Sequence, residues 1–354
     1  PSHLRQNPDQ QSSHFVREVY EKEIFPYRES AYGEPTNLSV LNLAYYPDER
    51  GPYNFDTRLT PEGKLKNPEE RWGGIMREIR TSDFEAANVE YVEFWVMDPF
   101  VYDDSPDRGG DLYINLGNIS EDILRDSRKF FEQGMPGPDE PFNVDSTSWG
   151  YVPTEQSMVE AFSNNPETRF QQDVGLNGLN SEQERDFYEK SPHPFISLIE
   201  DLYGSGNLEE EAYERIMEDP AADDYRYYRG SDFDQQETGI LDRYKKFNNP
   251  EGNSVPSEYS DENYSTAATT LPDVEDINRD NTLNEAENYY QYKISLRPED
   301  MQVGQNFITD QIESTVELRN GQKSSVTWYQ FKVPVSEPDT TIGDLSDLSS
   351  VRFM

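Results

Sequence analysis

Strand-like patterns at two places far apart in the sequence constrain the fold of this chain most. Residues 89–96 are almost continuously apolar or aromatic, and residues 112–116 alternate apolar and polar side chains. The same alternation returns at 290–296. A strand of this kind buries one face, so it needs neighbouring strands and a second layer over that face. Because each region alone has few strands, we expect the two to share one β-sandwich.

A β-hairpin extends the second region. Asn320-Gly321 is the dipeptide most typical of a tight hairpin turn, and it lies between Thr315–Arg319 and Gln322–Val335. In the second arm, Tyr329, Phe331 and Val333 alternate with polar residues. We expect both arms to belong to the sandwich.

The region between the two β segments is predicted to be helical and irregular. Ser120 is a suitable N-cap for a helix that ends near Gly134, and further helices are expected near 155–163, from Ser181 and from Asn207. Residues 219–270 are acidic, rich in tyrosine and without a clear period.

These patterns predict a mainly β fold with a helical insertion. Residues 1–70 form an extended segment with one strand at 38–46, residues 71–118 plus 287–354 form the split sandwich, and 119–286 form the insertion. The strand and loop pattern is similar to a galactose-binding-type jelly roll. The alternative is a pair of small β units joined by a helical linker.

Charge and composition exclude several classes of function. Asp and Glu total 70 against 31 Lys and Arg, which gives a formal net charge of −39. Such a chain is a poor partner for nucleic acid or anionic lipid. Aromatic residues make up 13% of the sequence, which favours a folded protein over an acidic disordered chain. Cysteine is absent, so disulfides and thiol chemistry are excluded, and no apolar run is long enough for a membrane helix.

A twelve-residue segment that begins at Asp276 has the spacing of an EF-hand calcium loop. Asn284 would act through water, and Asn281 stands at the sixth position, where the backbone needs a positive φ. We predict one structural calcium ion, with an acidic loop that caps a short helix as the alternative. The predicted ligands are Asp276, Asn278, Asp280, Thr282 (through its carbonyl) and Glu287.

Other polar groups are assigned no chemistry. Two acidic sets are interpreted as solvated loops, and a tyrosine group is interpreted as packing rather than as a sugar platform. No phosphate loop, dinucleotide fingerprint or nucleophile elbow is present, so we predict that the chain is not an enzyme. The acidic sets are Asp98, Asp103, Asp104, Asp107 and Asp111, and Asp219, Asp223, Asp224, Asp232 and Asp234; the tyrosines are Tyr225, Tyr227 and Tyr228.

Motifs along nearly the whole chain resemble the SprA/Sov family of Bacteroidetes. They agree with that family in order and in spacing. The motifs are Arg71–Arg77, Asp83–Glu85, Tyr91–Phe100, Asp111–Asp122, Arg125–Gly134, Gln172–Leu179, Tyr227–Asp232, Trp328–Pro334, Ile342-Gly343 and Val351–Met354.

The resemblance implies a role in the type IX secretion system. Members of the family are giant outer-membrane β-barrels that pass folded cargo to the cell surface and support gliding motility. Their implied partners are the rest of the translocon barrel, a PorV-like shuttle protein, a plug protein and the secreted cargo. The alternative function is a glycan-binding jelly-roll module of a surface protein.

The resemblance also sets the expected location. The chain lacks repeated lipid-facing strands, begins at Pro1 and ends directly after a strand-like pattern. We therefore expect a segment of a longer outer-membrane protein that does not itself insert into the membrane. A weak calcium loop suits the calcium-rich cell surface, with the periplasmic side as the alternative.

Overall fold

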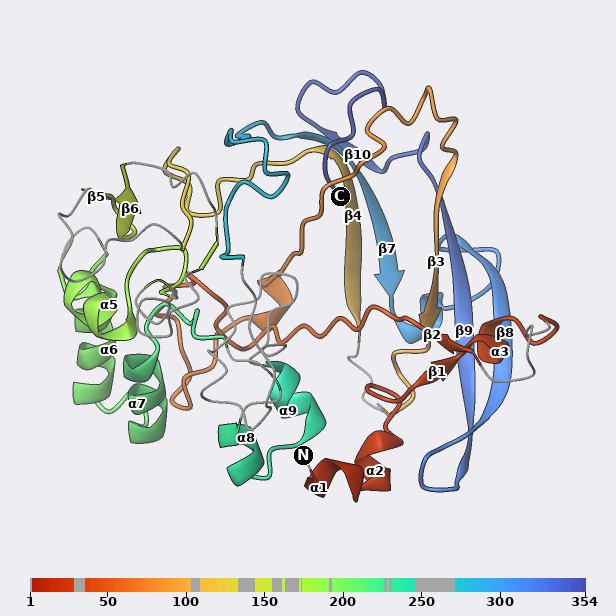
Figure 1. Cartoon of the computed structure of the whole chain (residues 1–354), viewed down its shortest axis with the longest axis horizontal. Coiled ribbons are helices and arrows are strands. Elements are labelled where there is room, and N and C mark those ends of the chain that lie inside the picture. The colour runs from red at the N-terminus through yellow and green to blue at the C-terminus, as the bar shows by residue number, and fades with distance from the viewer. Residues whose placement is uncertain are drawn as a thin grey trace. The chain divides into compact units, whose positions relative to one another are not determined.

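The computed structural model divides the chain into two compact units. It describes residues 2–28, 36–102, 109–132, 144–154, 161–162, 172, 174–190, 193–225, 228, 231–245 and 271–354. The first unit consists of Pro1–Leu43, Met76–Ser120 and Ala286–Met354, and the second of Ala44–Ile75 and Glu121–Glu285. Each unit therefore joins segments that are far apart in the sequence (Figure 1). The three-part domain organisation expected from the sequence stays a prediction.

The first unit contains two three-stranded antiparallel sheets. Their strand orders are β10–β7–β4 and β3–β9–β8. Strand β4 pairs with β7 and β3 pairs with β9, so the two strand-like regions of the sequence are hydrogen-bonded neighbours (Figure 1). The strands are β3 (Tyr91–Met97), β4 (Gly110–Asn118), β7 (Asn288–Leu296), β8 (Ile308–Glu317), β9 (Lys323–Pro334) and β10 (Thr340–Ile342).

The two sheets share one hydrophobic core. Leu116 and Ile294 of the first sheet and Phe331 of the second are buried in the same cluster. The ring of Phe94 stacks on that of Phe331 with 5.2 Å between centroids. Alternation of apolar side chains on β4, β7 and β9 produces this shared layer, because each strand turns one face inward.

Strand β9 is the central strand of its sheet and is covered on both faces. Phe331 and Val333 face the shared core, whereas Val326 and Trp328 belong to a second cluster with Val19 and other residues of the N-terminal segment. The almost continuous apolar run at 89–96 is typical of a central strand, but β3 lies at the sheet edge. An almost continuous apolar run reflects burial, and burial alone does not fix a strand's place in a sheet.

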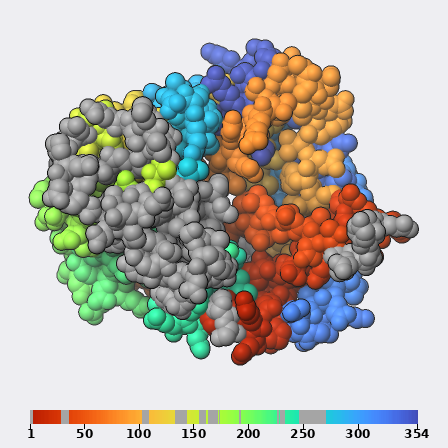
Figure 2. Space-filling view, in the orientation of Figure 1, coloured from red at the N-terminus to blue at the C-terminus, as the bar shows by residue number. Residues whose placement is uncertain are grey.

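The N-terminal segment covers the outer face of this sheet. Figure 2 shows it in red beside the blue β8–β9 hairpin. Ser314 Oγ donates to the carbonyl of Glu23, and the Asn320 N–H donates to Ser12 Oγ. Its elements are α1 (Ser2–Arg5), α2 (Pro8–Gln11), β1 (Val19–Tyr20), α3 (Glu21–Ile24) and β2 (Asn37–Leu38).

The strand predicted at 38–46 is wrong beyond Leu38. Leu41 and Leu43 alternate with polar residues but are 74% and 62% exposed, and β2 ends at Leu38. Alternation specifies a strand only where a partner backbone is in reach.

The hairpin prediction is confirmed. Strands β8 and β9 pair in antiparallel register from Glu317–Lys323 outward, and the Leu318 N–H donates to the carbonyl of Gln322 across the turn. Gly321 has a φ of 83°, which a residue without a Cβ adopts at little cost.

The second unit is mostly helical. It contains two hydrophobic clusters, the larger of which joins Leu59 and Leu65 to Tyr188, Ile199 and Ile216. A short hairpin, β5 with β6, and the 3-10 helix η1 (Pro68–Glu70) belong to this unit, whereas η4 (Pro298–Asp300) belongs to the first. The elements are β5 (Val144–Ser146), β6 (Tyr151–Pro153), α5 (Ser181–Tyr188), α6 (Phe195–Gly204), α7 (Glu210–Glu218), α8 (Ser231–Gln235) and α9 (Ile240–Lys245).

The helix predictions have mixed outcomes. A helix does begin at Ser181, but its capping box joins Asn180 to Gln183 rather than Ser181 to Glu184. The expected helix from Asn207 begins at Glu210. The helix near 155–163 falls almost entirely outside the described residues.

The helix predicted from Ser120 is wrong within the described residues 120–132. Arg125 and Ser127 have φ values of 53° and 59°, which no α-helix contains. Glu275 accepts the N–H groups of Leu124 and Phe130, so a distant carboxylate replaces the helical hydrogen bonds.

At the level of fold class, strands outweigh helices and the sheets are antiparallel, as predicted. Among the described helices, none has both the length and the hydrophobicity needed to span a bilayer.

Candidate metal centre

The predicted calcium loop is tightly turned around Asp276. One carboxylate oxygen of Asp276, Oδ1, accepts the N–H of Asp280 at 3.0 Å, and Oδ2 accepts the N–H of Asn281 at 2.8 Å. Asn281 has a φ of 67°, the left-handed conformation that the loop pattern needs at its sixth position. The chain therefore makes the sharp turn that the sequence pattern requires.

The next oxygen-bearing side chains also bond to the loop's own backbone. Asn278 Oδ1 accepts the N–H of Asp280 at 2.9 Å, and Asp280 Oδ1 accepts the N–H of Thr282 at 2.9 Å. Asp280 and Thr282 are exposed, whereas Asp276 is only 2% exposed. Asp276 is thus much more deeply buried than the predicted ligands Asp280 and Thr282.

Glu121 anchors this loop. Its side chain is fully buried, and Oε1 accepts the N–H groups of Ile277 at 2.8 Å and Asn278 at 3.3 Å. Its Oε2 accepts the N–H of Asn284 at 3.1 Å, so one carboxylate holds both ends of the loop. Burial raises the pKa of Glu121, and these three N–H groups oppose the rise.

A lysine lies beside the buried ligand. Lys129 Nζ is 3.4 Å from Asp276 Oδ2, and the side chains are 16% and 3% exposed. The ammonium group therefore neutralises part of the charge that a calcium ion would otherwise meet.

Glu287 is placed differently from the other four predicted ligands. It is an exposed residue directly before β7 and belongs to the first unit, whereas Asp276–Glu285 belongs to the second. Closure of the calcium shell by Glu287 stays a prediction.

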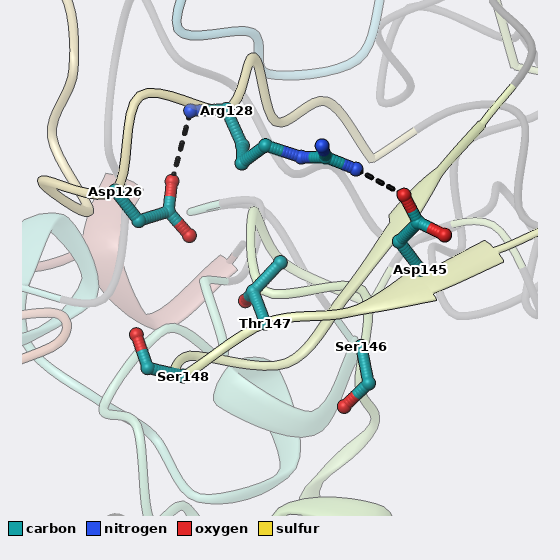
Figure 3. A pocket seen from close by; sticks show the side chains of 6 residues that line it. All are labelled: Asp126, Arg128, Asp145, Ser146, Thr147 and Ser148. Carbon is teal, nitrogen blue, oxygen red and sulfur yellow. Dashed lines mark hydrogen bonds and ion pairs between the residues drawn. The ribbon is translucent and has the colours of Figure 1, made fainter.

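A hollow near β5 is lined by polar side chains. It has a volume of about 370 Å³ and is open to solvent. Figure 3 shows Asp126 accepting the N–H of Arg128, whose guanidinium pairs with Asp145. Ser146, Thr147 and Ser148 complete the lining. Burial raises the pKa of Asp126, and the hydrogen bonds from Arg128 and Thr147 oppose the rise.

The first acidic set is partly neutralised by basic partners. Asp111 pairs with Lys293 at 2.9 Å and with Arg297 at 2.5 Å, and the hydrogen bond from Arg297 lowers the pKa of Asp111. Asp103, Asp104 and Asp107 lie outside the described residues.

The interpretation of the second acidic set as a solvated loop is wrong for two of its members. Asp219 and Asp223 are only 9% and 6% exposed, because the chain after α7 turns inward. With Glu184 of α5 they form a group of three carboxylates whose ligand atoms all lie within 4.8 Å of one another. Asp224 is exposed, Asp234 pairs with Arg243 at 2.7 Å, and the side chain of Asp232 is not described.

The tyrosines give no sugar platform in the described part of the chain. Tyr228 stacks on Tyr244 with 5.0 Å between centroids, so its ring is used in packing. Tyr227 lies outside the described residues.

Comparison with known protein families gives one match. Residues 197–354 match the model of SprA_N, which is described as a motility related/secretion protein. The matched range runs from α6 through the predicted calcium loop to the end of the chain. No curated protein matches the sequence significantly.

Proposed function

We propose that this chain is a non-catalytic segment of the type IX protein secretion translocon, because residues 197–354 match the SprA_N family model of a motility related/secretion protein. In this role it takes part in the passage of folded cargo to the cell surface and in gliding motility. The family match is the observation that carries the proposal.

The fold and the surface charge support this proposal. The matched range includes α6–α9 of the second unit and β7–β10 of the first, so the family relationship extends into both units. Motifs of the same resemblance lie in residues 71–134, before the matched range. A formal net charge of −39 suits a segment that stays hydrated while cargo passes it.

The partners in this proposal are the rest of the translocon, a PorV-like shuttle protein, a plug protein and secreted cargo. Site-specific photo-crosslinking in secreting cells tests them. A benzoylphenylalanine at Trp72, which is 81% exposed, should capture at least one of these proteins, whereas the same group at the fully buried Phe353 should not. Normal secretion without an adduct to any of them from Trp72 or from the 96% exposed Tyr27 would contradict the proposal.

We place the segment on the cell-surface side of the outer membrane, with the periplasmic side as the alternative. The chain contains no cysteine, so a single introduced cysteine reports its own location. In a full-length protein without other cysteines, Tyr27→Cys should react with a membrane-impermeant maleimide in intact cells. Reaction only after the outer membrane is opened would place the segment in the periplasm.

Two finer features belong to the same proposal. The two sheets of the first unit, which share one core, form a jelly-roll-like sandwich of the galactose-binding type. The loop from Asp276 binds one structural calcium ion through Asp276, Asn278, Asp280, Thr282 and Glu287. The turn at Asn281 supports the calcium assignment, and its test is given in the Discussion.

A further inference from the structure

Three carboxylates converge inside the second unit, away from the calcium loop. Glu184 comes from α5, Asp219 directly follows α7 and Asp223 lies in the next turn. Their exposed fractions are 1%, 9% and 6%. Burial of three like charges is costly unless a cation or protons neutralise them.

Two of the carboxylates are held in fixed orientations by hydrogen bonds. Glu184 accepts from Asn177 Nδ2 at 2.6 Å through Oε1 and from the N–H of Ala221 at 3.1 Å through Oε2. Asp219 Oδ1 accepts the N–H of Asp223 at 3.1 Å. These bonds preorganise the oxygens but add no positive charge between them.

The third carboxylate carries the independent observation. Asp223 Oδ2 is buried and accepts no hydrogen bond of normal geometry from the described residues, although a longer interaction with the Tyr53 hydroxyl favours the charged form of this carboxylate. A buried carboxylate oxygen without a donor is rare in folded proteins and calls for an ion or a proton. Gly175, at φ 75°, leaves the space for it, because a Cβ there would lie 2.0 Å from Asp223 Oδ2.

The charge balance around the group fits a divalent ion. Arg50 is the cation whose charge acts on Glu184 and Asp219, and its Nη1 donates to the carbonyls of Asn54 and Pro220. The charge of the exposed Asp224 also acts on Glu184 and Asp223, so the carboxylates outnumber the guanidinium and the group attracts a divalent cation.

We propose that Glu184, Asp219 and Asp223 bind one divalent cation through their carboxylate oxygens, with Ca²⁺ as the best-suited ion. All three ligands are hard oxygen donors, and no His or Cys belongs to the group. Two oxygens on opposite sides of Ca²⁺ lie up to about 5 Å apart, which covers the 4.8 Å spread of these ligand atoms. This site is separate from the calcium loop and does not depend on the proposed role in secretion.

The competing explanation is that protons neutralise the group. Burial, with the charge of Glu184 next, raises the pKa of Asp223 well above its usual range, and burial raises the pKa of Glu184 to about 7. Protons alone would neutralise the group without a metal ion, so direct binding of Ca²⁺ distinguishes the two explanations.

Calorimetric titration with CaCl₂ alone, and separately with MgCl₂ alone, tests the site in the metal-free chain. The background variant is Asp276→Asn, which weakens the loop site. This variant should still bind one Ca²⁺ per chain, and binding should be lost when Asp223→Asn is added. The matched control adds Asp224→Asn instead, which removes the same charge from an exposed neighbour and should leave binding intact.

Failure of both ions to bind this background would overturn the proposal, as would binding that survives Asp223→Asn. Each of these results would leave the calcium loop and the secretion role untouched.

Discussion

Asp276 lies between two competitors for its carboxylate. Its oxygens accept two backbone N–H groups of the loop, and Lys129 Nζ lies 3.4 Å away. The Lys129 ammonium group and a calcium ion would compete for the space next to Asp276 Oδ2. We therefore expect Lys129 to lower the calcium affinity of the proposed loop site.

Lys129→Met should therefore tighten calcium binding by the loop. Removal of one nearby positive charge is worth on the order of 1 kcal/mol for a partly buried pair, which corresponds to about a fivefold change in dissociation constant. Calorimetric titration of the Asp223→Asn background measures this site without the buried carboxylate group. Lys190→Met, at an exposed position, is the control. Unchanged or weaker binding in Lys129→Met would contradict the loop as a calcium site.

Glu121→Ala should destabilise the second unit. The substitution leaves the N–H groups of Ile277, Asn278 and Asn284 without their acceptor, at a cost on the order of 3 kcal/mol. Urea unfolding measures the loss, with the exposed Glu182→Ala as control. Equal stabilities of the two variants would show that water replaces Glu121 at no cost.

At the scale of elements, the sequence predicted strands more accurately than it predicted helices or the buried carboxylates that hold loops in place. Alternation on β4 and β7 is local, and it predicted both strands to within a few residues. The region 120–132 has helical spacing, but Glu275 reaches Leu124 across 151 positions and takes its N–H. The loop turn at Asn281 was predictable, whereas its Glu121 anchor was not, because Asn284 is 163 positions away.

The N-terminal segment is held to the β-sheet by a titratable element. His14 is buried, its Nδ1 accepts Arg17 Nε–H at 2.9 Å, and its Nε2 lies 2.9 Å from Ser324 Oγ of β9. Since arginine only donates, the imidazole must be neutral here and donates to Ser324 from Nε2. Arg17 also forms a two-bond ion pair with Glu23.

Docking of this segment should weaken in acid. Burial and then Arg17 lower the pKa of His14 below 6.5, while Glu23 opposes the shift. A lowered folded-state pKa means that this stabilisation is full above pH 6.5 and is lost as pH falls through 6.5 towards the folded value. The hydrogen-exchange protection factors of Val19 and Ile24, which correct for the intrinsic effect of pH on exchange, should therefore be lower at pH 5 than at pH 7.5.

Two variants separate His14 from other groups that titrate in this range. His14→Gln should remove the difference between the two pH values, whereas His3→Gln should retain it. Equal protection factors at both pH values in the native chain would show that His14 does not control docking.

At the scale of the whole molecule, the chain passes between the two units several times, yet each unit has its own hydrophobic clusters. Of the eight proposed ligands of the two cation sites, seven belong to the second unit and Glu287 belongs to the first. Cation binding should therefore stabilise the second unit more than the first.

The four tryptophans make this prediction measurable, because each unit contains two of them. Trp149 packs between Phe55 and His193 in the second unit, and Trp328 is buried in the first. We compare a chain that keeps Trp149 as its single tryptophan with one that keeps Trp328. Millimolar Ca²⁺ should raise the melting temperature reported by Trp149 and change that reported by Trp328 much less. Binding at a hundredfold excess over the dissociation constant adds about 2.7 kcal/mol to the unit that holds the ion. Equal shifts at both tryptophans would mean that the two units unfold as one, and no shift at either would remove both cation sites.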